Sequence, residues 1–468
     1  EKKLRGKNLK SSTFLIYHFT CHIMDNSRYI HQLKKIYTLI HDYIANENDM
    51  VGINDIEDYI KKQNICENKP ELKLILHLIS AISANHHRRE NLSAKIQELL
   101  TLLENPIKQT FSNSDIFYLF RKDKKLLLFL FQQKILIPDN YILRQIINNK
   151  SYCHFFYPEI KPMLTEEQLK LIENDMMSSD PNIFVNFEEN RQQGENISII
   201  CSLIRDDRVE EFITYVNKYN YPLYNQIKPS IFETNSFLLK KWPTLIEYAS
   251  FFGSIQIFQY LLMNNVELSP SLWLYAIHGC NAELIHLLEY NKVQKDDTFF
   301  KESIKCHHND IVNYFYNNFL EQSERSKAFD LAIQFYNFEF IDEFIDFDNI
   351  SFVSSLCKYD YFSLFESYLN TVTDINLSFL RIAAEKNNHD IVQLIVSKQG
   401  IQFNEGMFKG CKKLTTISIP LDTKSIQASV FEGCSSLMEI SIPDSVELIC
   451  HGAFEGCSTL EKVTFSSS

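Results

Sequence analysis

Two internal repeats with different periods fill the second half of this 468-residue chain. From about residue 199 to residue 400, a small anchor residue recurs and is followed by an acidic or amide residue and an aliphatic pair. The anchors from 249 onward are 27, 27, 29, 24 and 27 residues apart: Ala249, Ala276, Ser303, Ala332, Leu356 and Ala383, with an earlier copy at Leu203. Each unit predicts two short amphipathic helices, which bury a core only by stacking on neighbouring units. This part of the chain therefore has to form an array.

The second repeat has a period of 23 residues and begins near Phe403. Its copies read Phe408-Lys-Gly-Cys411-Lys-Lys-Leu414, Phe431-Glu-Gly-Cys434-Ser-Ser-Leu437 and Phe454-Glu-Gly-Cys457-Ser-Thr-Leu460. Each copy continues in an alternating Leu-x-x-Ile-x-Ile pattern, or Val and Phe in the last copy. The alternation predicts short strands with apolar residues inward and polar residues on an exposed sheet.

Both repeats resemble known families. The helical units resemble ankyrin repeats, since Thr244-Leu245 to Ala249 and Gly253 follow that family's motif and Ala383 to Ile395 is the best match. The ankyrin unit has about 33 residues, so shorter units imply short or absent β-turn fingers. The 23-residue units resemble BspA-type leucine-rich repeats through Phe-x-Gly-Cys-x-x-Leu. The combination resembles a family of uncharacterised proteins in parasitic protists.

The expected fold is mainly α: an ankyrin-like α-solenoid, preceded by a helical N-terminal domain and followed by a short leucine-rich-repeat (α/β or β) solenoid. The predicted domains are 24–185, 186–400 and 401–468, with 1–23 as an uncertain leader. Apolar residues at spacings of three and four and a Thr165–Gln168 capping box indicate helices in the first domain. We expect the leucine-rich repeats to continue beyond residue 468, because solenoids need capped ends.

Composition limits the function and the location. A net charge of -12 disfavours nucleic-acid binding. No apolar run approaches the ~20 residues of a membrane span. Eleven cysteines without a Cys-x-x-Cys pair indicate reduced thiols and a cytoplasmic protein. A cell-surface location is the alternative, because BspA-type repeats are known from surface and adhesion proteins.

The sequence contains no phosphate-binding glycine loop, nucleophile elbow or zinc-protease helix, so we expect no enzyme activity and no cofactor. An enzyme with an unrecognised site in the N-terminal helical domain stays open as an alternative. His278, Cys280, Cys306, His307 and His308 lie on neighbouring units and could approach one another as zinc ligands. The preferred interpretation is no metal, with His307 at the turn position of Gly253 and Cys280. Cys411, Cys434 and Cys457 should stack in a line as small buried hydrophobic residues.

The predicted function is a non-enzymatic scaffold that binds a protein partner through stacked repeat surfaces. A surface adhesin is the alternative. In the helical array, candidate contacts lie on the concave side, two residues before and two residues after the anchors, and in the second solenoid they lie on the outward face of the strands. These candidates are Glu247, Phe251, His278, Lys301, Lys305, Asp330, Lys358, Arg381, Glu385, Thr416, Glu439 and Lys462.

Overall fold

The computed structural model describes residues 27–44, 51–85, 91–295, 298–319, 322–341, 347–372, 375–398 and 403–466. Its described residues are mainly helical, and the strands lie between Thr416 and Ser466, as the mainly α prediction requires. The chain divides into two compact units, Ile36–Glu339 and Phe340–Ser468 with the chain up to Lys35. The division falls inside the helical array.

The larger unit begins with helices that precede the array. Residues 27–44 are helical, and this unit takes in that helix from Ile36 onward. Next come α2 (Ile53–Lys62), η1 (Ile65–Glu67), α3 (Lys69–Asn85), α4 (Leu92–Leu102), α5 (Glu104–Thr110), α6 (Asn113–Phe120), α7 (Lys124–Gln132), α8 (Asn140–Ile147), α9 (Lys150–Phe155), α10 (Tyr157–Ile160), η2 (Lys161–Met163), α11 (Glu166–Ser179) and α12 (Phe187–Gln193). Polar side chains cap several of these helices. The predicted Thr165–Gln168 capping box is confirmed at the start of α11.

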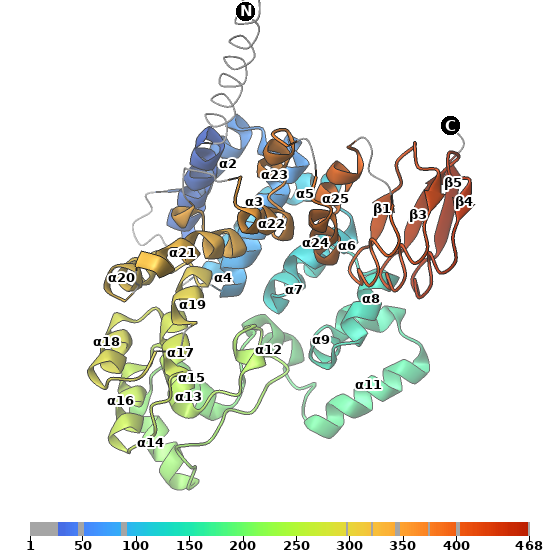
Figure 1. The fold of residues 1–468 in the computed structure, drawn as a ribbon. Coiled ribbons are helices and arrows are strands. Elements are labelled where there is room, and N and C mark those ends of the chain that lie inside the picture. The colour runs from blue at the N-terminus through green and yellow to red at the C-terminus, as the bar shows by residue number, and fades with distance from the viewer. Residues whose placement is uncertain are drawn as a thin grey trace, which may run out of the picture. The chain divides into compact units, whose positions relative to one another are not determined.

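Paired helices then stack in two rows (Figure 1). In one row, each helix packs on the next: α13 (Ile199–Arg205), α15 (Leu245–Phe252), α17 (Leu272–Gly279), α19 (Phe299–Lys305) and α21 (Gln322–Phe335). The second row holds α14 (Val209–Lys218), α16 (Ile255–Met263), α18 (Ala282–Tyr290) and α20 (Asn309–Asn318). Two short 3₁₀ helices, η3 (Leu238–Lys240) and η4 (Phe338–Phe340), complete this part. The helical repeats of the sequence therefore correspond to stacked helix pairs.

One turn geometry recurs in every repeat. Four residues after each anchor, the backbone enters the left-handed region with φ between 47° and 65°, at Asp207, Gly253, Cys280, His307, Tyr336, Asp360 and Asn387. The next N–H returns to the anchor carbonyl, as from Asn388 to Ala383 at 3.0 Å. This hydrogen bond closes the helix C-terminus as in a Schellman motif. The predicted turn position of His307 is confirmed.

An insertion between α14 and α15, which includes the short helix η3, lies against the array. Its Phe237 ring contacts Phe251, Tyr275 and His278, with ring centroids 5.9, 4.9 and 4.2 Å apart. The insertion therefore covers positions of α15 and α17 that the repeat pattern alone leaves open.

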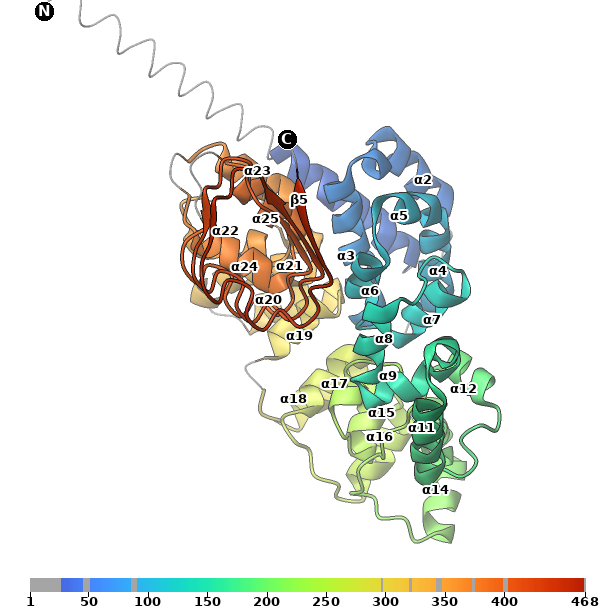
Figure 2. The same cartoon turned by 90° about the vertical axis from the view of Figure 1, so that its right-hand side faces the viewer.

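In the smaller unit, helix pairs lead into coils that carry strands. The helices are α22 (Ile350–Lys358), α23 (Phe362–Leu369), α24 (Ser378–Lys386) and α25 (His389–Val396). The strands are β1 (Thr416–Ser418), β2 (Ser425–Ile426), β3 (Glu439–Pro443), β4 (Leu448–Ile449) and β5 (Lys462–Ser466). They form parallel sheets in the orders β1-β3-β5 and β2-β4. Figure 2 looks along the stack, where the coils overlap as closed outlines.

The 23-residue period sets the register of the coils, because equivalent residues lie directly over one another. Thr416 pairs with Glu439, which pairs with Lys462. The rings of Phe408, Phe431 and Phe454 form a stacked column with centroid distances of 5.3 and 5.4 Å. We call this the phenylalanine column.

Candidate interaction surfaces and a polar cavity

The outward face of β1-β3-β5 is a polar surface, which we call the sheet face. Ile417 and Ile440 point into the coil and are buried, whereas Ser418, Ser441 and Thr464 are exposed. A second row on this face holds Thr416, Glu439 and Lys462. The structure therefore brings three predicted contact residues into one row.

Ion pairs across the coils keep this part of the surface nearly neutral. Glu439 and Lys462 approach to 3.5 Å on the sheet face. Away from the strands, Lys409 contacts Glu432 at 2.8 Å. Both residues of the Glu439–Lys462 pair are more than half exposed, so salt screens their attraction and they stay accessible to a partner.

Thr416 is the least accessible of the three. It is half-buried, and its hydroxyl lies 3.1 Å from Nδ1 of His389 at the start of α25. Neighbouring Thr415, which the alternation places outward, is instead buried and donates two hydrogen bonds of 3.1 Å to Asn387. These contacts fix the first coil to the helix pair before it.

The predicted contacts on the helical array separate into three groups. Lys301, Lys358, Arg381 and Glu385 are exposed, and Arg381 pairs with Glu385 at 3.0 Å. Glu247, Lys305 and Asp330 are half-buried. Glu247 completes the capping box of α15 and accepts a hydrogen bond from Ser271. Lys305 contacts Glu302 at 2.5 Å.

Phe251 and His278 form the third group, and the expectation that they face solvent is wrong. Phe251 is 2% exposed and His278 is 0% exposed. The physical reason is the insertion, because Phe237 packs against both rings. Residues two positions after the anchor are thus internal in these two repeats.

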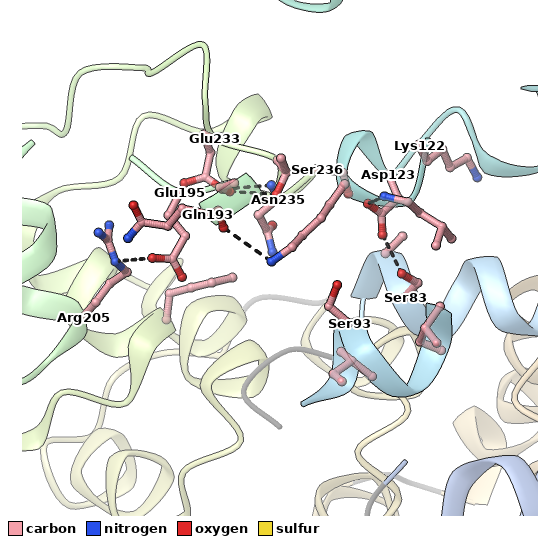
Figure 3. Close-up of a pocket in the computed structure, with 18 of the residues that line it drawn as sticks. Ser83, Ser93, Lys122, Asp123, Gln193, Glu195, Arg205, Glu233, Asn235 and Ser236 are labelled. Carbon is pink, nitrogen blue, oxygen red and sulfur yellow. Dashed lines mark hydrogen bonds and ion pairs between the residues drawn. The ribbon is translucent and has the colours of Figure 1, made fainter. Parts of the chain in front are cut away.

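The larger unit also contains a polar cavity of about 550 Å³ that the sequence did not predict (Figure 3). Its walls come from α3, α4, α7, the α12–α13 loop, the end of α13, the insertion and the end of α15. The charged groups in its lining are Lys122, Asp123, Lys125, Glu195, Arg205, Asp206 and Glu233.

One wall of the cavity is the start of α7. Asp123 caps α7 by accepting from the N–H of Leu126 at 2.9 Å, and Ser83 donates to its other oxygen at 2.6 Å (Figure 3). Burial nevertheless raises the pKa of Asp123. Behind this wall, fully buried Lys124 donates to Ser151 at 2.7 Å and to the Glu233 carbonyl at 3.4 Å. Burial lowers the pKa of Lys124 to about 7.

The opposite wall holds Arg205 and Glu233. Arg205 lies 2.8 Å from Glu195 and donates to the Tyr248 hydroxyl at 3.1 Å. Glu233 accepts from the N–H of Asn235 at 2.8 Å, and burial raises its pKa to about 7. A carboxyl group that titrates near neutrality beside a cavity suits either proton transfer or a structural hydrogen bond.

Gly194 fixes the loop between these walls. Its φ of +72° lies in the left-handed region, and its carbonyl accepts from the hydroxyl of Thr234 at 2.7 Å. A Cβ atom at this position would lie 3.0 Å from that hydroxyl oxygen, so the loop and the insertion approach closely because residue 194 has no side chain.

The three cysteines of the coils are packing residues, as the sequence predicted for this line of thiols. Cys411 and Cys434 are buried, and Cys457 is half-buried. Cys434 donates to the carbonyl of Phe408 at 3.2 Å, and Cys457 to that of Phe431 at 3.1 Å. Burial raises the pKa of each thiol.

Comparison with known families agrees with this geometry in the last part of the chain. A family model described as a BspA type leucine-rich repeat region (6 copies) matches residues 383–468. The match begins within α24 and includes all five strands. No curated protein and no solved structure matches the chain. The ankyrin resemblance of the helical units stays a prediction.

None of the helices within the described ranges combines the length and the apolar character that a bilayer crossing requires.

Proposed function

We propose that this protein is a non-enzymatic scaffold that binds a protein partner through the sheet face. The observation that carries the proposal is the fixed register of three parallel strands, which holds two rows of polar side chains over a core that is buried beneath β1 and β3. Such a surface needs little ordering when a partner docks, so little binding energy is lost to conformational entropy.

The composition of the sheet face indicates the kind of partner. Ser418, Ser441 and Thr464 offer hydroxyl groups, and Glu439 and Lys462 offer one charge of each sign. A protein surface with mixed polar groups complements this face better than a polyanion does.

We infer that the helical repeats of each unit supply further binding contacts. Lys301, Lys358, Arg381 and Glu385 are exposed, and an ankyrin-like solenoid would use them as contacts. The array is proposed here as ankyrin-like on the basis of its motif and its stacked helix pairs.

A cytoplasmic location is the proposed one, supported by the absence of disulfides among the described cysteines. A cell-surface adhesin is the alternative, supported by the BspA-type match and the hydroxyl-rich sheet face. Protease treatment of intact cells distinguishes the two, because only a surface protein is digested while a cytosolic marker survives.

An enzyme is the third candidate, and Glu233 in the polar cavity is the observation that favours it. The scaffold is preferred because Asp123, Glu195, Arg205 and Glu233 each have a hydrogen-bond or ion-pair partner within the protein.

Site-specific photo-crosslinking tests the sheet face. A photoreactive residue replaces Ser441 on this face, or Glu447 as an exposed control directly before β4, a strand of the other sheet. In extracts of the cells that make the protein, we expect a distinct cross-linked protein from position 441 but not from position 447. Ser441→Arg should weaken the binding of that protein by at least about tenfold, equivalent to 1.4 kcal/mol. Equal labelling from both positions would refute the proposal.

A further inference from the structure

Three side chains with metal-binding atoms meet in the interior of the helical array. They are His278 on α17, Glu302 on α19, and Cys306, which directly follows α19. Nε2 of His278 lies 2.7 Å from a Glu302 oxygen, and Sγ of Cys306 lies 3.5 Å from Nδ1 of His278. Their ligand atoms lie within 4.8 Å of one another, and no other group of this kind occurs among the described residues.

These residues depart from the repeat pattern at one place. The residue before the anchor is Tyr248 or Tyr275 in the two preceding units, but it is Glu302 in the third. The position two residues after the anchor also differs between units. It holds Phe251 in one unit and His278 in the next. The aromatic side chains at these positions pack between the stacked helices. A buried carboxylate or imidazole instead costs free energy, unless the two are paired or bind an ion.

The backbone places the donors on facing surfaces. Glu302 and Cys306 are four residues apart, so they lie on the same face of one helix. Helix α17 packs against α19 and presents His278 to that face. Two neighbouring repeats thus supply one carboxylate oxygen, one imidazole nitrogen and one sulfur.

We propose that His278, Glu302 and Cys306 bind a zinc ion. Zinc sites use these three donor types, and three protein ligands leave a fourth position for water. Calcium and magnesium prefer oxygen donors throughout, so the imidazole and the sulfur select against them. On binding, the zinc–sulfur bond replaces the sulfur–hydrogen bond of Cys306, and the proton passes to solvent; His278 binds as the neutral imidazole.

Two aromatic rings and a lysine surround the three ligands. The rings of Phe237 and Phe251 lie 4.2 and 5.4 Å from the His278 ring and limit access of water. Lys305 contacts Glu302 at 2.5 Å and holds its carboxylate in orientation. The ion would therefore connect α17 with α19, next to the ring of Phe237 from the insertion.

The assignment differs from the set that the sequence suggested. Cys280 is exposed at the left-handed turn after α17, and His307 occupies the equivalent turn after α19. Nδ1 of His307 lies 3.3 Å from the Tyr37 hydroxyl. Neither residue belongs to the group of three.

Metal content of the full-length chain tests the proposal. The protein is produced with added zinc, desalted and measured by mass spectrometry of the metal. We expect one zinc ion per chain, and Cys306→Ser and Glu302→Gln should weaken zinc binding by more than about tenfold. Cys280→Ser is the matched control, since it alters a cysteine after the neighbouring helix, and it should keep the zinc. Circular dichroism checks that each variant folds; Glu302→Gln preserves side-chain shape and keeps the test valid if Cys306→Ser does not fold.

Cobalt substitution tests the ligand set independently of affinity. With saturating Co²⁺, the parent protein, Glu302→Gln and Cys280→Ser should show a sulfur-to-cobalt charge-transfer band, and Cys306→Ser should lack it. A parent protein that binds no zinc, or a zinc content that depends on Cys280 and not on Cys306, would overturn the assignment.

Discussion

Replacing Phe431 by alanine should destabilise the leucine-rich-repeat coils by about 3–5 kcal/mol, the usual cost of removing a buried aromatic ring. Phe431 is 0% exposed and lies between Phe408 and Phe454 in the phenylalanine column. The substitution removes both ring contacts and leaves a cavity that the coils above and below cannot fill. Phe454→Ala is the matched variant. Phe454 is half-buried and stacks on Phe431, so its loss should cost about 1.5–3 kcal/mol.

Hydrogen exchange measured by mass spectrometry reports the loss of stability separately for each segment of the chain. Each 1.4 kcal/mol is a factor of ten, so protection in 403–466 should fall at least about a hundredfold in Phe431→Ala. Both tryptophans, Trp242 and Trp273, lie in the Ile36–Glu339 unit, so their fluorescence serves as an internal control. The urea midpoint of the tryptophan fluorescence should stay unchanged in both variants, because solenoid coils stabilise mainly their neighbours. A protection loss below tenfold, or equal losses in the two variants, would refute the role assigned to the column.

Three further substitutions test contacts in the larger unit. Asp207→Gly keeps the left-handed turn but removes a carboxylate that accepts hydrogen bonds from two N–H groups of α16 at 3.0 Å. The free energy of unfolding in urea should therefore fall by about 1–2 kcal/mol. An unchanged urea midpoint would argue against this cap. Gly279→Ala places Cβ 2.4 Å from the Ser250 carbonyl oxygen and should cost about 1–3 kcal/mol. Gly52→Ala, with its nearest atom 3.6 Å away, should cost less, because it changes only the N-cap residue of α2; equal melting temperatures would contradict the close approach at Gly279. For Glu233, the pKa rises from 4.5 to about 7 on folding, so its stabilising effect is complete below pH 4.5 and is lost as the pH rises to about 7. The parent protein should lose up to about 3 kcal/mol over this range, and Glu233→Gln should not; parallel pH profiles would count against the assignment.

Local structure was predictable from the sequence wherever the repeats determine it. The anchors predicted the stacked helices, and the alternation around Ile417 and Ile440 predicted strands that bury these residues. The turn position of His307 followed from alignment with Gly253 and Cys280. These features depend on contacts within a unit or between neighbouring units, which recur with the sequence period.

Features that depend on the insertion were not predictable in this way. Phe237 belongs to no repeat, so nothing in the periodicity indicated that it covers Phe251 and His278. The polar cavity was missed for the same reason, because its lining comes from segments spread between Ser83 and Phe252. Glu302 did carry a signal, since a carboxylate stands where the preceding units have tyrosine.

The strict columns of the coils also bear on how such a chain changes in evolution. Phenylalanine stacks on phenylalanine, and a Cβ atom added at Gly456 would meet the backbone of Gly433 at 3.4 Å. A substitution in one coil therefore has to suit the coils on both sides, which constrains independent drift at these columns. Duplication or deletion of a whole 23-residue unit creates no new kind of contact, because every residue again meets its own equivalent. Gene-level changes in repeat number should thus be tolerated more readily than single replacements in these columns.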